Sequence, residues 1–156
     1  MRALSRLGAC AALAFFAAGC AATPHRRRPP APVPKLAKAA IRIAKSYLPE
    51  EEGHRVPPAD CSEFVQKVFA ENGIKLPRTS REMSKAGRPL ASASELRMGD
   101  LVFFSGSRIS RTVGHVGIYV NNGIFIHRPD VGEVRMESLY SDYFRKRYLT
   151  ARRVIE

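Results

Sequence analysis

The stretch Asp60-Cys61-Ser62-Glu63-Phe64-Val65-Gln66-Lys67-Val68-Phe69 predicts the helix around which the rest of the chain folds. Its apolar residues recur at helical spacing and form one apolar stripe. Pro57 and Pro58 precede it and cannot continue a helix, so the helix must begin close to Asp60. Asp60 and Glu63 have the spacing of a capping box, in which side chains and backbone of the first turn bond to each other.

Cys61 lies in the first turn of this predicted helix. Unpaired backbone N–H groups and the helix dipole favour an anion there, so we expect its thiol to ionise more readily than a free one. Since the thiolate is the reactive form, Cys61 is a candidate nucleophile. The alternative at this point is a small cysteine buried beneath a helix, which is common in proteins.

The N-terminus has the pattern of an export signal. Two arginines are followed by an apolar run over residues 7–18, which is too short for a comfortable membrane span. The run ends at Ala17-Ala18-Gly19-Cys20, which resembles a bacterial lipoprotein box with Ala in the place of the usual Leu. We expect residues 1–19 to be removed and Cys20 to carry a lipid that attaches the protein to the outer membrane. Ordinary signal-peptidase cleavage and an uncleaved anchor remain the alternatives.

The cysteine count then becomes informative. Cys10 would leave with the signal and Cys20 would be lipidated, so Cys61 would be the single thiol of the exported protein. This excludes a disulfide framework and strengthens Cys61 as a nucleophile. Residues 20–34 are rich in proline and arginine and are expected to form a semi-extended tether. Residues 35–156 would then form one domain.

The charge of the chain indicates an anionic partner. It carries 26 basic and 14 acidic residues, a formal charge of +12, and loss of the signal leaves +10. Such a balance suits nucleic acid, a membrane surface or an anionic polymer. Export and the lack of an aromatic-rich basic strand argue against nucleic acid. Peptidoglycan, whose stem peptides carry carboxylates, is an anionic polymer in the right compartment.

Helices are predicted first and strands later, an order typical of an α+β fold. An amphipathic helix is predicted over residues 35–48, and the Cys61 helix runs to about residue 71. A short helix near residues 80–85 and a connector over residues 91–97 follow. Four strands are then predicted, over residues 101–104, 115–120, 124–128 and 148–154.

His115 and His127 belong to a predicted hairpin around Asn121-Asn122-Gly123. A two-residue loop would pair Ile118 with His127 and put the histidines on opposite faces of the sheet. A three-residue loop, with its glycine left-handed at a bulge, would pair Gly117 with His127 and put both histidines on one face. The other face is then uniformly apolar, so we favour the three-residue loop, with Gly117 leaving space between the histidines.

Two histidines beside one exported thiol suggest a nucleophile, a base and an orienting group. His115 would deprotonate Cys61, and His127 would fix the His115 ring through its other nitrogen. The competing interpretation is a zinc site made by the same three residues, because three N/S ligands and a water form a catalytic zinc pattern. No short two-ligand spacing accompanies the cysteine, so the spacing favours the triad, and we expect no metal or cofactor.

These motifs, in this order, resemble those of the NlpC-type cell-wall cysteine peptidases, a branch of the papain-like superfamily. The resemblance covers about residues 35–153. It is carried by Asp60-Cys61-Ser62, Ile74-Lys75-Leu76-Pro77-Arg78-Thr79-Ser80, Met98-Gly99-Asp100-Leu101-Val102-Phe103-Phe104, Val113-Gly114-His115-Val116-Gly117-Ile118-Tyr119 and Ile124-Phe125-Ile126-His127.

The resemblance implies a papain-like α+β fold with the nucleophile helix packed on a small antiparallel sheet. It also implies hydrolysis of peptide bonds in peptidoglycan stem peptides, often the D-glutamyl–diaminopimelate link. The family's nucleophile, base and third polar residue correspond to Cys61, His115 and His127. The motif residues expected to bind substrate are Asp60, Ser62 and Arg78.

Two departures from the family pattern concern activity. Glu63 stands where the family usually has Gly, and a carboxylate near the thiol opposes thiolate formation unless it points back to cap the helix. The usual Tyr upstream of the nucleophile is missing, and Tyr47 is out of register by about two residues. Two alternatives stay open: an amidase or acyltransferase with the same triad, and a non-catalytic lipoprotein that binds peptidoglycan.

Overall fold

The computed structural model describes residues 33–156, so the predicted signal, Cys20 and most of the predicted tether lie outside the described residues. In the described part, helices precede most of the strands, and the predicted α+β fold is confirmed. No helix in residues 33–156 is long and apolar enough to cross a membrane. The elements are α1 (Lys35–Lys45), α2 (Cys61–Ala70), α3 (Ser80–Met83), β1 (Arg88–Pro89), a 3-10 turn (Ala93–Glu95), β2 (Leu101–Ser105), β3 (Val113–Asn121), β4 (Ile124–His127), β5 (Arg135–Ser138), α4 (Asp142–Arg145) and β6 (Tyr148–Arg153).

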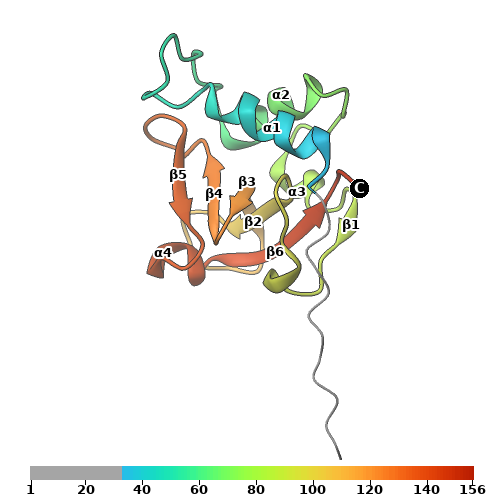
Figure 1. Cartoon of the computed structure of the whole chain (residues 1–156). Coiled ribbons are helices and arrows are strands. Elements are labelled where there is room, and N and C mark those ends of the chain that lie inside the picture. The colour runs from blue at the N-terminus through green and yellow to red at the C-terminus, as the bar shows by residue number, and fades with distance from the viewer. Residues whose placement is uncertain (1–32) are drawn as a thin grey trace, which may run out of the picture. The chain divides into compact units, whose positions relative to one another are not determined.

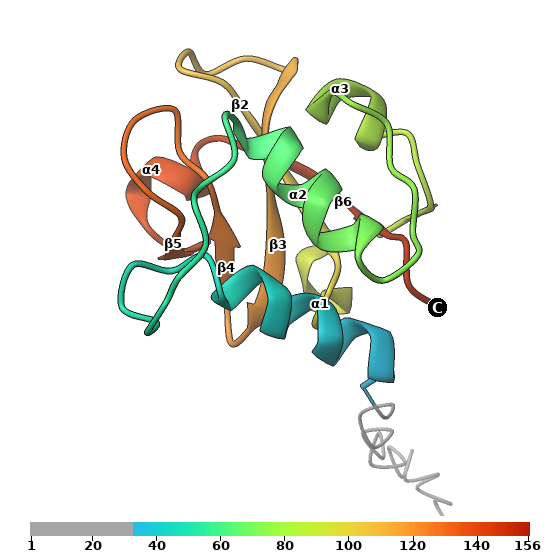
Figure 2. The same ribbon diagram turned by 90° about the horizontal axis from the view of Figure 1, so that it is seen from above.

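The six strands form one antiparallel sheet in the order β1-β6-β2-β3-β4-β5. Strand β2 lies in the middle and is buried along its whole length, as expected for a run of apolar residues covered on both faces. Helices α1 and α2 lie side by side over one face, and α4 lies against the other (Figures 1 and 2). The fold therefore has a layer with α1 and α2, the sheet, and the shorter helix α4 on the opposite face of the sheet.

Two apolar clusters hold these layers together. The larger one joins α1 and α2 to the sheet, and its fully buried members include Phe64, Val68, Phe103 and Ile118. The smaller one lies on the opposite face and is built on Phe104, Phe125 and Phe144. Burying side chains of this size contributes roughly 1.5–3 kcal/mol each, so α2, with four such residues, is firmly anchored.

The β3–β4 hairpin has the predicted register but not the predicted loop. Asn122 and Gly123 form a two-residue loop, with φ of 47° and 77°, and Asn121 pairs with Ile124. A bulge between Tyr119 and Asn121 shifts the ladder, so that Ile118 pairs with Ile126. The predicted three-residue loop is therefore wrong, because the extra residue is absorbed within β3. The shift still places both histidines on one face, the face of Phe104 and Phe125.

Candidate active site

Asp60 caps α2 and thereby fixes the position of Cys61. Its carboxylate accepts a hydrogen bond of 2.8 Å from the Glu63 backbone N–H, as predicted. The reciprocal bond differs from a capping box, because the Glu63 carboxylate accepts from the N–H of Ala59, one residue earlier, at 2.8 Å. Glu63 also pairs with Lys67 at 2.9 Å, so its charge is compensated. The carboxylates that act on the Cys61 thiol are those of Asp60 and Asp130.

Cys61 is buried where α2 meets β3, with 8% of its surface exposed. Burial raises the pKa of the Cys61 thiol, and the nearby backbone N–H groups of Val116 and Ser62 offset that rise only in part. The expectation of an easily ionised thiol is therefore wrong for the free protein, because desolvation outweighs the field of the helix start. Since Val116 directly follows His115 and α2 packs on β3, the sulfur lies near the strand that carries the predicted base.

His115 and His127 form a dyad. Nε2 of His115 lies 2.7 Å from Nδ1 of His127, with the two rings nearly perpendicular at 88°. His127 is 2% exposed and its ring packs against Phe125 and Phe144. Burial lowers the pKa of His115 to about 4 and that of His127 to about 3, so both rings are neutral at pH 7.

The dyad determines which nitrogen of His115 can act as a base. If Nδ1 of His115 is to accept a proton, its Nε2 must carry hydrogen and donate to Nδ1 of His127. His127 then carries its own hydrogen on Nε2, which is buried and has no hydrogen-bond partner among the described residues. Nε2 of His115 and Nδ1 of His127 are hydrogen-bonded to each other and are therefore not free to bind a common cation. Within residues 33–156 no three His, Cys, Asp or Glu side chains are placed to bind a metal.

The predicted substrate-binding residues form one polar network at the start of α2. Arg78 donates to Asp60 at 2.6 Å and to the Ser62 hydroxyl at 2.9 Å. Ser62 in turn donates to the same carboxylate at 2.8 Å. The Arg78 guanidinium and these hydrogen bonds hold the pKa of Asp60 well below its usual range. The network therefore keeps a fixed, ionised carboxylate beside Cys61.

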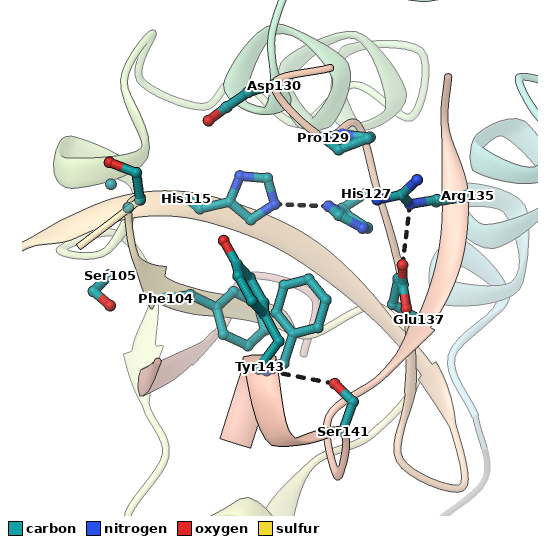
Figure 3. A pocket seen from close by; sticks show the side chains of 14 residues that line it. Phe104, Ser105, His115, His127, Pro129, Asp130, Arg135, Glu137, Ser141 and Tyr143 are labelled. Carbon is teal, nitrogen blue, oxygen red and sulfur yellow. Dashed lines mark hydrogen bonds and ion pairs between the residues drawn. The ribbon is translucent and has the colours of Figure 1, made fainter. Parts of the chain in front are cut away.

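A cavity of about 320 Å³ lies beside the dyad, and both histidines line it (Figure 3). Its walls include His115, and Asp130 and Tyr143 lie on opposite sides of that ring, Tyr143 with its hydroxyl toward it. The other charged lining residues are Arg135 and Glu137, whereas Cys61 is not part of the lining. Sequence reasoning missed these residues, since it assigned no element between residues 128 and 148. The one available signal was the Ser141-Asp142 pair, which has the form of a helix start.

The chain matches the model of the NlpC/P60 family over residues 50–153. It belongs to the NlpC/P60 family. Over 97 residues it is 44% identical to a murein DD-endopeptidase/murein LD-carboxypeptidase, MepS, of Escherichia coli K12, a match that covers 62% of this chain and half of the relative. Over 95 residues it is 41% identical to a bifunctional muramidase/DL-endopeptidase, CwlT, of Bacillus subtilis, covering 61% of this chain and 28% of that protein.

The fold comparison agrees with the family assignment. A crystal structure of an NlpC/P60 family protein from Bacillus cereus superposes with a TM-score of 0.68 at 28% identity, covering 80% of this chain and 42% of that one. The papain-like arrangement, with α2 packed on a small antiparallel sheet, is therefore the NlpC/P60 fold. The predicted family is confirmed.

Two further expectations, one about Tyr47 and one about Gly117, can be compared with the structure. Tyr47 is buried and its ring packs edge-on against Phe64, so it belongs to the core and not to the site. Gly117 does not leave an open space between the histidines: a Cβ there would meet the Phe125 ring at 2.6 Å. Gly117 instead lets Phe125 pack closely beneath His127.

Proposed function

We propose that this NlpC/P60 protein is an exported cysteine endopeptidase that hydrolyses peptide bonds in peptidoglycan stem peptides. The observation that supports this most directly is the His115–His127 dyad, which joins β3 to β4 where β3 packs against the Cys61 helix. In this proposal Cys61 would be the nucleophile, His115 the base and His127 the group that orients the base. Relatives named murein DD-endopeptidase and DL-endopeptidase support the substrate class.

The reaction would be acyl transfer through a thioester. As the Cys61 sulfur attacks the peptide carbonyl, its proton passes to Nδ1 of His115. The backbone N–H of Cys61, which has no acceptor among the described residues, would bind the developing oxyanion at the helix start. When the C–N bond breaks, His115 gives that proton to the leaving amine. Water then attacks the thioester while His115 takes its proton, and the C–S bond breaks to release the acid and restore the thiol.

His127 would act on the base and not on the substrate. Its Nδ1 would accept from Nε2 of His115, which would select the required tautomer and stabilise the imidazolium as it forms. On the acyl side, the Asp60–Ser62–Arg78 network would bind polar groups of the stem peptide next to the nucleophile.

The proposed chain organisation places this domain at a membrane surface. Residues 1–19 would be a signal peptide, Cys20 the lipidated N-terminus, residues 20–34 a tether and residues 35–156 the peptidase domain. Mass spectrometry of the N-terminal peptide from the membrane fraction tests this, since a diacylglycerol-modified Cys20 is expected. An unmodified N-terminus would contradict it.

The decisive test is digestion of purified muropeptides by the detergent-solubilised full chain, read by mass spectrometry. We expect a new fragment with the wild type and none with Cys61→Ala. Cys20→Ala is the control, because it removes the proposed lipid attachment site and keeps the nucleophile, so cleavage of soluble muropeptides should be unchanged. Binding to sacculi without any cleavage would favour the non-catalytic alternative. Release of ammonia or acyl transfer without peptide cleavage would favour the amidase or acyltransferase alternative.

A further inference from the structure

Helix α1 carries a row of positive charge along one side. Its four basic residues follow one another at intervals of three, four and three residues, so they share one side of the helix: Lys35, Lys38, Arg42 and Lys45. The buried residues of α1 are all alanine or isoleucine and face the core. The helix contains no acidic residue. These four residues are called the basic row below.

The basic row has no counter-charge bound to it. Within residues 33–156 none of its members forms an ion pair. All members except Lys35 line an open groove of about 490 Å³ beside α1. Glu51 is the one carboxylate among the lining residues, so three cations against one anion leave the groove with a formal charge of +2. A groove of this sign attracts an anion.

The stability of α1 does not explain the position of Lys35. A helix start carries partial positive charge, so an acidic residue stabilises it and a lysine opposes it. The first turn of α1 has no acidic residue, and Pro34 at the N-cap provides no side-chain cap. Val33 and Leu36 are exposed beside it, at 40% and 46%. Exposed apolar side chains next to unpaired cations are typical of a helix that lies on an anionic membrane surface.

The proposed chain organisation brings such a surface within reach of α1. The helix begins directly after the proposed tether of residues 20–34, whose full extension is at most about 50 Å. A lipid on Cys20 would therefore hold the basic row close to the headgroups, at a high effective concentration. Basic residues held near anionic headgroups strengthen a lipid anchor, and the tether itself contains three consecutive arginines, Arg26 to Arg28.

Contact through α1 would leave the candidate active site open. Helices α1 and α2 cover one face of the sheet, whereas α4 lies against the other (Figures 1 and 2). The histidine dyad lies on the α4 side, where His127 packs against Phe144. No residue that lines the groove beside α1 lines the cavity beside the dyad. A domain resting on α1 would thus turn its dyad away from the membrane.

We propose that the basic row of α1 is a docking surface for a membrane, and that it binds the phosphate groups of anionic phospholipids. The inference rests on the proposed lipidation of Cys20, which keeps the domain near the bilayer, and not on the catalytic mechanism. It adds a contact made by the folded domain itself, which fixes how the domain stands on the membrane.

The test measures how fast individual lysines are acetylated by a water-soluble reagent, read by mass spectrometry. The full chain is mixed with vesicles of equal parts phosphatidylcholine and phosphatidylglycerol, or of phosphatidylcholine alone. We expect Lys35, Lys38 and Lys45 to react about threefold or more slowly on the anionic vesicles, and the difference to vanish at high salt. Lys146, an exposed lysine directly after α4, should react equally on both.

Two double variants test whether the row itself makes the contact. Lys38→Gln with Arg42→Gln leaves Lys45, at the far end of the row from the tether, as the reporter, and should remove its protection. Arg145→Gln with Lys146→Gln removes the same charge from exposed positions at α4 and should leave Lys45 protected. Both variants should cleave soluble muropeptides at the wild-type rate, because neither changes the candidate active site.

The outcomes separate this inference from the proposed function. Equal acetylation of the row on both kinds of vesicle, or Lys45 protection that survives in Lys38→Gln with Arg42→Gln, overturns the docking surface. Equal protection by purified sacculi without vesicles assigns the row to the polymer and also overturns it. If wild type cleaves no muropeptide while the row is protected, the peptidase fails and the docking surface stands. An unmodified Cys20 with a protected row removes the anchor and leaves the docking surface.

Discussion

Replacing His127 with phenylalanine should separate the orientation of the base from the stability of the fold. His127 is 2% exposed and its ring lies among Phe125 and Phe144. A phenylalanine ring has nearly the same shape and suits these neighbours. The substitution removes both ring nitrogens, and with them the 2.7 Å hydrogen bond to His115.

The expected change in stability is small because its parts oppose each other. Losing the hydrogen bond costs about 0.5–1.5 kcal/mol, whereas removing the buried, unpartnered Nε2 of His127 recovers about 1–3 kcal/mol. His115 is only half-buried and lines an open cavity, so water can reach its released Nε2–H. The melting temperature should therefore stay within about 5 °C of wild type.

The expected change in activity is large. The bond is made to a ring that becomes positively charged in the transition state, and hydrogen bonds to charged groups contribute about 1.5–3 kcal/mol. Loss of that amount lowers kcat about 10- to 150-fold, and loss of the tautomer preference adds to it. KM should change little, because His127 does not contact substrate in the proposed mechanism.

The assay is muropeptide hydrolysis followed beside thermal unfolding of the same preparations. His127→Gln is the matched variant, since its amide oxygen can accept from His115 and should recover part of kcat. The reasoning is refuted if His127→Phe retains wild-type kcat. It is also refuted if kcat falls only in proportion to a loss of folded protein.

Two further predictions concern pH and a buried ion pair. Because burial lowers the pKa of His115 to about 4, kcat/KM should fall on the acid side only near pH 4. A fall near pH 6.5 would contradict a lowered pKa of this base. Between about pH 6.5 and pH 3 the unfolded chain binds more protons than the folded one, because both histidines have a lowered pKa in the folded protein. The free energy of unfolding should therefore fall as the pH drops through this window. Urea melts at pH 7 and pH 5 measure the fall, which should be less steep in His127→Phe. Arg153→Met leaves Asp100 buried without its 2.7 Å partner and should cost about 3–5 kcal/mol in urea melts. Arg88→Met removes only exposed ion pairs and should cost about 0–1 kcal/mol, so equal losses would contradict the distinction.

The parts of the fold that could be predicted depend on local signals. The start of α2 follows from two prolines and an N-cap at Asp60, and its end from Gly73 with φ of 75°. The register of β3 against β4 was predicted because alternating apolar residues must all reach one face. The same pattern does not determine where an extra residue goes, so the bulge between Tyr119 and Asn121 could not be predicted.

The parts that could not be predicted depend on contacts between distant segments. Strand β5 has one apolar residue, Met136, and no burial pattern that marks it as a strand. Helix α4 has four residues and becomes recognisable only through Phe144, which packs between Phe104 and Phe125. The cavity is formed by residues from several of these segments, so neither the cavity nor the position of Asp130 in its wall could be predicted from the sequence.

The raised pKa of Cys61 and the lowered pKa of His115 determine the protonation state of the thiol in the free protein. A raised pKa for the thiol and a lowered pKa for the imidazole both keep the proton on sulfur in the free protein. A buried, protonated thiol reacts slowly with oxidants and alkylating agents, which suits the one free cysteine of residues 33–156. In the proposed mechanism, proton transfer accompanies the attack on a bound peptide, whose developing oxyanion the helix start would stabilise. Alkylation of Cys61 by iodoacetamide should accordingly be slow at pH 7 in the free protein.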